Sequence, residues 1–124
     1  INREVQIILL SSPKLYSNII RISQKMNLPY VVPSYKTVSV LDVAALIQNL
    51  QLIITPDTSI VHIASAFNIP IVSIHEKNNQ SYHLFKPKSQ NSRTVFSEFS
   101  DRLDGYNIDK IIRDSMDLLK INES

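Results

Sequence analysis

Several features that define common functional classes are missing from this chain of 124 residues. It contains no cysteine, which excludes disulfides, a thiol nucleophile and cysteine-based zinc sites. No apolar run approaches the roughly 20 residues that a membrane-spanning helix needs, and the first residues carry no signal-peptide pattern. Together these absences favour a cytoplasmic protein.

An excess of charge of one sign is also missing. The chain has 13 Lys and Arg residues against 11 Asp and Glu residues, which gives a formal net charge of +2. No stripe of like charge runs along the sequence, so nucleic acid is not an expected partner.

Glycine is unusually scarce. Gly105 is the only one in the chain, whereas soluble proteins contain about 7% glycine. A dinucleotide-binding fingerprint or a Walker A loop needs several glycines before its helix, so neither motif is present. If the chain binds phosphate, side chains and a helix N-terminus must provide the contacts.

Short apolar runs alternate with segments whose apolar residues recur at helical spacing. This alternation predicts an α/β domain over 1–124, with a mostly parallel sheet of about five strands and helices on both faces. The continuous apolar character of the strands fits a sheet covered on both sides. Strands are expected at 5–10, 30–32, 52–54, 69–74 and 94–96. A polar segment at 76–93 is too long for a simple connector and leaves the carboxyl end of a strand.

The helices between these strands have expected boundaries and apolar faces. Asn27 should end the first helix, Ser39 and Asp42 resemble a capping box, and Asn107 should begin the last helix. Asn68 and Pro70 should close the helix that begins near Asp57. The expected buried faces are Leu15, Ile19, Ile22 and Met26; Val40, Val43, Ala44 and Ile47; Ile60, Ile63, Ala64 and Phe67; and Ile108, Ile111, Ile112, Ser115, Leu118 and Leu119.

The stretch 54–72 contains the strongest functional signal. An apolar strand runs into a helix start, where Asp57 is a good N-cap. Thr58, Ser59 and His62 lie three and four residues apart and share one side of the first turn. Free N–H groups and the helix dipole make such a turn suitable for an anion. The pattern predicts a phosphate or sugar-phosphate pocket, although capping alone would also explain Asp57, and a local hydrogen bond would explain His62.

Other polar residues are expected near the same sheet edge. Ser11, Ser12 and Lys14 follow the first strand, where they could meet phosphate or ribose or form a solvated loop. His75 and His83 lack carboxylates at metal-ligand spacing, so no metal site is expected. No catalytic set is legible, and the catalytic residues stay unassigned. Positive residues of the long polar segment fit a solvated surface best: Lys77, Lys86, Lys88 and Arg93.

The segment 52–72 resembles the C-terminal domain of the lipopolysaccharide heptosyltransferase family, glycosyltransferase family 9. That family has an apolar strand followed by Asp-Thr-Gly, two residues, His and an Ala-rich helix, and then Pro and a second strand. This chain has DTSIVHIASA at 57–66 and IPIV at 69–72. The helix at 39–47, the Phe85-Lys86-Pro87 element and the strand at 5–11 are similar to other parts of the same domain.

The resemblance implies a Rossmann-like, three-layer domain that forms the C-terminal half of a bacterial GT-B glycosyltransferase. This half binds a nucleotide-diphospho-sugar, typically ADP-heptose, without a metal or cofactor. Thr58 and Ser59 would face the diphosphate, Asp57 the sugar hydroxyls, and His62 the same pocket. A lipopolysaccharide or other cell-surface glycan acceptor, and the general base, would belong to a missing N-terminal domain. The chain would then be an inactive fragment of an enzyme that is cytoplasmic or peripheral to the inner membrane.

The chain departs from the family pattern at several positions. Ser59 replaces the motif glycine, Ser11 replaces a glycine after the first strand, and 75–78 replaces a Gly-Pro-Thr loop. Lys14 stands where some relatives have an acidic ribose-binding residue. Three alternatives therefore remain open: a degenerate, non-catalytic nucleotide-binding domain, a GT-B-like sugar-nucleotide epimerase, and a flavodoxin-type interaction domain. An acidic residue in place of His62 would favour the epimerase, and an acidic cluster near Ser11 would favour the interaction domain.

Overall fold

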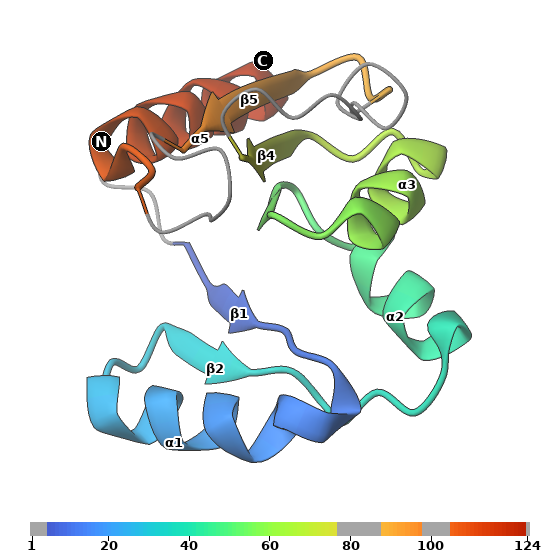
Figure 1. Cartoon of the computed structure of the whole chain (residues 1–124), viewed down its shortest axis with the longest axis vertical. Helices are drawn as coiled ribbons and strands as arrows, with labels where there is room; N and C mark the ends of the chain where they lie inside the picture. The colour runs from blue at the N-terminus through green and yellow to red at the C-terminus, as the bar shows by residue number, and fades with distance from the viewer. Residues whose placement is uncertain (1–4, 77–87, 98–104, 124) are drawn as a thin grey trace. The chain divides into compact units, whose positions relative to one another are not determined.

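The computed structural model describes residues 5–76, 88–97 and 105–123. The chain divides into two compact units, Ile1–Val43 and Ala44–Ser124, and each contains a small parallel sheet (Figure 1). The expected strands and helices are all present among the described residues. The Phe85-Lys86-Pro87 element and the loop residues Lys77, Asn78 and His83 lie outside these residues.

The first unit contains one strand–helix–strand motif. β1 (Ile7–Leu9) pairs in parallel with β2 (Val31–Pro33), and η1 (Pro13–Leu15) and α1 (Tyr16–Met26) connect them. Helix α1 ends as predicted at Asn27, which adopts a left-handed conformation with φ of 49°. Asparagine tolerates this conformation better than most residues other than glycine. The expected apolar face of α1 is only partly buried, because Ile19 is buried while Leu15, Ile22 and Met26 are exposed.

Helix α2 (Val40–Ile47) begins with the predicted capping box. Ser39 Oγ accepts the N–H of Asp42 at 3.3 Å, and Asp42 Oδ2 accepts the N–H of Ser39 at 3.3 Å. The predicted burial of Val40 is wrong, since this side chain is 70% exposed whereas Ile47 is fully buried. Val40 is the first helical residue, and side chains there point back past the N-terminus, beyond the packed part of the helix.

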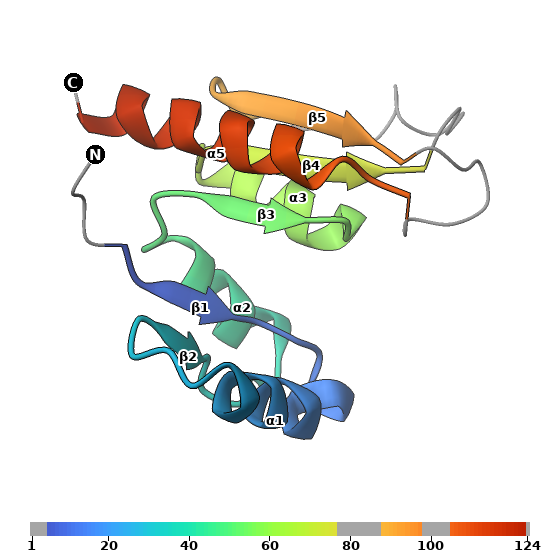
Figure 2. The same cartoon turned by 90° about the vertical axis from the view of Figure 1, so that its left-hand side faces the viewer.

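The second unit contains a three-stranded parallel sheet in the order β3-β4-β5. Its strands are β3 (Ile53–Thr55), β4 (Ile71–His75) and β5 (Ser92–Phe96). All five residues of the central strand β4 are buried, because α3 (Thr58–Ala66) covers one face of the sheet and α5 (Ile108–Glu123) the other (Figure 2). The predicted α/β class and parallel pairing are confirmed. The five described strands, however, form sheets of two and three strands rather than a single sheet.

The core of this unit lies on both faces of β4. Val72, Ile74 and Val95 pack against α5, and Val61 and Ala64 are the buried residues of α3. The prediction that Phe67 is buried is wrong, since this side chain is 43% exposed. Phe67 is the C-cap residue, with φ of −94° and ψ of 3°. Its backbone has left the helix, so its side chain no longer follows the buried face.

The start of α5 is capped as predicted, because Asn107 Oδ1 accepts the N–H of Lys110 at 3.1 Å. The predicted buried face of α5 is partly wrong. Ile108 is 60% exposed and Ile112 is 55% exposed, while Asp114 is buried. Six predicted positions covered more of the helix than the sheet can bury. The side chains that are buried are Ile111, Asp114, Ser115 and Leu118.

The end of α3 leads directly into β4 through a Schellman motif. Asn68 has φ of 54°, and its N–H donates to Ser65 O at 3.0 Å. The N–H of Ile69 donates to Ala64 O at 2.9 Å. These two bonds satisfy carbonyls at the helix end, so the predicted role of Asn68 is confirmed.

Candidate functional site

The candidate site lies at the carboxyl edge of the three-stranded sheet. β3 ends at Thr55 and β4 ends at His75, and the two strands are parallel neighbours. The start of α3 and the end of β4 are therefore at the same edge, as predicted for the Asp57 and His75 loops. Open α/β sheets bind their ligands at this edge.

Asp57 forms a strong cap on α3. Its Oδ1 accepts the N–H of Ser59 at 2.8 Å, the hydroxyl of Ser59 at 2.6 Å and the N–H of Ile60 at 3.3 Å. The Ser59 hydroxyl is the main cause of a lowered Asp57 pKa; burial opposes the shift and the two N–H groups support it. The Asp57 N–H donates to Thr55 Oγ1 at 3.1 Å, which fixes the cap to the end of β3.

This cap uses most of the donors at the helix start. The N–H groups of Ser59 and Ile60 bind Asp57 Oδ1, and the N–H of Val61 donates to Asp57 O at 3.0 Å. Within the described residues, the N–H and hydroxyl of Thr58 make no hydrogen bond and Asp57 Oδ2 accepts none. The site therefore offers an anion the Thr58 donors and the helix dipole, and offers a hydroxyl donor the second oxygen of Asp57.

Ser59 occupies the position of the motif glycine without backbone strain. It lies inside α3, and among the described non-glycine residues only Asn27 and Asn68 have positive φ. A glycine is therefore not needed here for its conformational freedom. The serine instead adds a side chain that bonds the cap, so its hydroxyl strengthens the Asp57 turn.

His62 lies on the same helix, one turn beyond Thr58. Thr58, Ser59 and His62 are all exposed, and their spacing places them on one side of the helix start. The structure thus keeps the imidazole on the solvent side of α3, away from the buried side formed by Val61 and Ala64.

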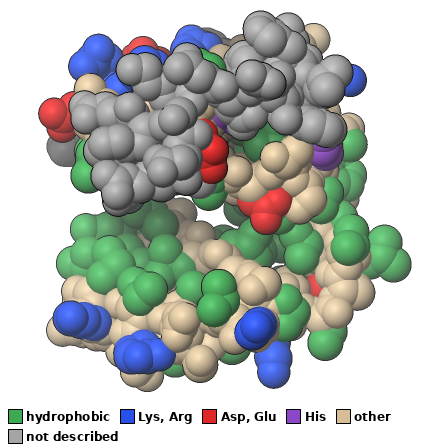
Figure 3. All heavy atoms as spheres, viewed as in Figure 1, with side chains coloured by type: hydrophobic (Ala, Val, Ile, Leu, Met, Phe, Trp, Pro, Cys, Tyr) green, Lys and Arg blue, Asp and Glu red, His purple; other side chains and the backbone are tan. Residues whose placement is uncertain are grey.

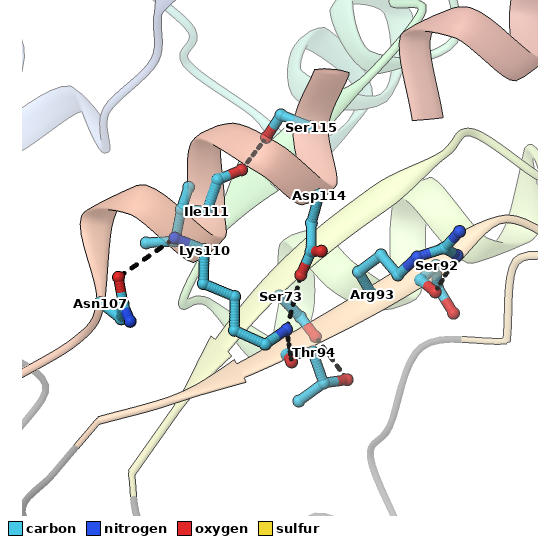
Figure 4. A network of polar contacts seen from close by, with 9 residues as sticks. All are labelled: Ser73, Ser92, Arg93, Thr94, Asn107, Lys110, Ile111, Asp114 and Ser115. Carbon is cyan, nitrogen blue, oxygen red and sulfur yellow. Dashed lines mark hydrogen bonds and ion pairs between the residues drawn. The ribbon is translucent and has the colours of Figure 1, made fainter. Parts of the chain in front are cut away.

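A row of hydroxyl groups crosses the sheet beneath this edge, and the sequence analysis missed it. Thr55 pairs with Ser73, and Ser73 pairs with Thr94, so the three side chains share one face of the sheet. Ser73 Oγ lies 3.4 Å from Thr94 Oγ1 (Figure 4). The sequence signal was a single Ser or Thr in each of three apolar strands, but its meaning depends on the strand register.

His75 extends this polar row to the end of β4. Its Nε2 lies 3.0 Å from Ser73 Oγ, and its ring lies 6.0 Å from that of Phe96. The side chain is buried, and the resulting desolvation lowers its pKa. His75 is therefore a neutral imidazole at neutral pH, held directly below the carboxyl edge.

The remaining predicted site residues belong to the first unit. Ser11 Oγ donates to Ser12 O at 2.9 Å, and Lys14 lies exposed in η1. Both follow β1, but their position relative to Asp57 stays a prediction. Lys and Arg side chains are scattered among other types on the face shown in Figure 3.

Searches for metal ligands and membrane spans gave no candidates in the part of the chain that the structure describes. No group of three or more His, Asp or Glu residues is placed to hold a metal ion. No described helix has both the length and the apolar character needed to cross a membrane.

Fold and site together define a class. A parallel α/β sheet with a capped helix start and polar side chains at its carboxyl edge is typical of Rossmann-like, ligand-binding domains. The chain belongs to glycosyltransferase family 9 (heptosyltransferase), whose model matches residues 1–104. The family predicted from the motif at 57–66 is thus confirmed. Comparisons with curated proteins and with solved structures gave no match.

Proposed function

We propose that residues 1–124 form the nucleotide-sugar-binding domain of a glycosyltransferase. The observation that carries this proposal is the Asp57-capped start of α3, which lies at the carboxyl edge of a parallel sheet in a family 9 chain. The donor that the family resemblance favours is ADP-heptose. The acceptor would be a lipopolysaccharide or another cell-surface glycan, bound mainly by a second domain.

Each residue at the helix start has a chemical role in this proposal. The N–H and hydroxyl of Thr58 bind the diphosphate, with support from the helix dipole. Asp57 is anionic and would repel phosphate, so its Oδ2 accepts a hydroxyl of the donor sugar instead. Ser59 orients Asp57 through the 2.6 Å hydrogen bond. His62 lies one turn further along and contacts the same ligand.

The residues after β1 have a less specific role. Ser11 and Lys14 supply a hydroxyl and a cation, which suit ribose or phosphate. The full enzyme would act in the cytoplasm, free or peripheral to the inner membrane, where nucleotide sugars and lipid-linked acceptors meet.

The site assists transfer by stabilising the leaving group. As the glycosyl bond breaks, negative charge grows on the departing diphosphate. Donors already aimed at that charge stabilise it without reorganisation. Thr58 and the start of α3 provide this stabilisation, and the general base would come from the other domain.

Calorimetric titration of the chain with ADP-heptose, ADP and a UDP-sugar tests the proposal. We expect ADP-heptose to bind, and Thr58→Val to weaken binding about tenfold because a hydrogen bond to a charged oxygen is lost. Ser17→Ala, which removes an exposed hydroxyl in α1, is the matched control and should bind as the unaltered chain does. Unchanged affinity of Thr58→Val would exclude this helix start as the diphosphate site.

One observation favours a second candidate, a domain that binds nucleotides without catalysis. Ser59 replaces the family glycine, and Asp57 already occupies the N–H groups of Ser59 and Ile60. Fewer free donors would remain for the transition state. Normal binding of ADP-heptose, combined with no transfer by the complete two-domain protein, would establish this alternative.

A further inference from the structure

Strand β5 lies at the edge of its three-stranded sheet. The N–H of Ile71 donates to Asn91 O at 3.1 Å just before this strand. The N–H of Ser97 donates to His75 O at 2.8 Å just after it. Because successive residues of a strand direct their backbone groups to opposite sides, the residues in step with 91 and 97 face β4. Those that face away from β4 are Ser92, Thr94 and Phe96.

Cationic side chains cover two of the carbonyls on this outer side. Arg93 Nη1 donates to Ser92 O at 3.0 Å. Lys110 Nζ, which comes from α5, donates to Thr94 O at 3.4 Å (Figure 4). Both acceptors are groups that an incoming strand would need for its own hydrogen bonds.

Lys110 is held in this position by its own helix. Its Nζ lies 2.6 Å from Asp114 Oδ2, and the Asp114 side chain is only 12% exposed. If the ammonium moved away, it would leave a largely buried carboxylate unpaired, which is strongly unfavourable. The Asn107 cap also fixes the backbone N–H of Lys110. The ammonium is therefore anchored beside the strand edge.

We propose that Lys110 and Arg93 guard the outer edge of β5 against pairing with β5 of a second copy of this chain. The strand contains Thr94, Val95 and Phe96, residues with high β-propensity. An uncovered strand of this kind can act as a template for a second strand. The same edge on another copy is self-complementary, so the unguarded product is a strand-paired dimer. This property is independent of nucleotide-sugar binding.

The test compares self-association of charge variants of the full chain by sedimentation velocity over a concentration series. Lys110→Met should self-associate at least about tenfold more tightly than the unaltered chain, because a carbonyl becomes free to accept a hydrogen bond. Lys110→Arg keeps a cation at the edge and should remain like the unaltered chain. Lys120→Met removes the same charge from an exposed position of α5 and is the matched control.

Loss of folding must be separated from loss of the guard. The double variant Lys110→Met/Asp114→Leu removes both charges together, a replacement that often leaves stability unchanged or improved. It should fold and self-associate, and hydrogen exchange of the Ser92 amide should slow in the associated form. A folded double variant that stays as monomeric as the Lys120→Met control would overturn the proposal. Association without protection of that amide would also overturn it.

Discussion

Asp57 combines a structural and a ligand-binding role on different atoms of one carboxylate. Oδ1 holds the first turn of α3 through three hydrogen bonds, while Oδ2 makes none with the described residues. Since one oxygen is committed to the cap, the stability of the helix and the affinity for a ligand are coupled at this residue.

Asp57→Ala should lower the free energy of unfolding by about 1 kcal/mol, because the N–H groups of Ser59 and Ile60 lose their cap. Asp57→Asn retains an oxygen acceptor and should cost less. Urea unfolding followed by circular dichroism measures both variants. Equal stability of the alanine variant and the unaltered chain would mean that water caps the helix equally well.

His75 predicts a pH dependence of stability. Burial lowers its pKa in the folded state below the ordinary value of 6.5, so the unfolded chain binds the proton more readily. The contribution of a neutral His75 is complete above about pH 6.5 and is lost progressively as the pH falls below that value. Thermal melts between pH 5 and about pH 8 should therefore show a fall in stability on the acidic side.

The control for this pH effect is His75→Asn, which cannot titrate in that range and can still bond Ser73. This variant should show a weaker fall in stability as the pH drops. If its acid-side slope equals that of the unaltered chain, the slope comes from other groups and His75 is not its cause.

At the scale of elements, the connection from α3 to β4 is as tightly specified as the start of α3. Asn68 adopts the left-handed conformation, and its Oδ1 accepts the N–H of Gln90 at 2.9 Å. The Lys88 N–H donates to Ser65 Oγ at 3.0 Å. The end of α3 thus fixes the segment that leads into β5.

Asn68→Ala should lower the free energy of unfolding by more than about 1 kcal/mol, because alanine disfavours the left-handed conformation and cannot bond Gln90. Asn68→Gly keeps the conformation easily and loses only the side-chain bond. The difference between the two variants in chemical denaturation isolates the backbone term. If both lose the same stability, the conformation of residue 68 contributes nothing.

At the scale of the whole molecule, the proposed function divides binding from catalysis. A transferase must bring a donor and an acceptor together, and the site at Asp57 supplies groups for a donor only. The described residues of this site include a cap, hydroxyl groups and an exposed imidazole, which suit binding and leaving-group stabilisation.

We therefore expect residues 1–124 to bind the donor without transferring its sugar. In a complete two-domain protein, Thr58→Val and His62→Ala should each slow transfer by roughly ten- to a thousandfold, because donors aimed at the leaving diphosphate contribute about 2–4 kcal/mol in the transition state. Steady-state kinetics and thermal melts of each variant measure these effects. Sugar transfer by the isolated chain, or normal rates in both variants, would contradict this division of roles.

The sequence by itself determined the features that depend on near neighbours. Asp57, Asn107 and Asn68 bond within a few residues of themselves, so their capping roles were predictable from residue type and position. The same holds for the apolar strands and for the family motif at 57–66. Tertiary structure decided the features that need distant residues. Ser73 and Thr94 meet through strand register, and Asp114 rather than Ile112 is buried because only one sector of α5 faces the sheet. Side-chain burial and cross-strand contacts depend on packing between segments, and the local sequence pattern does not encode that packing directly.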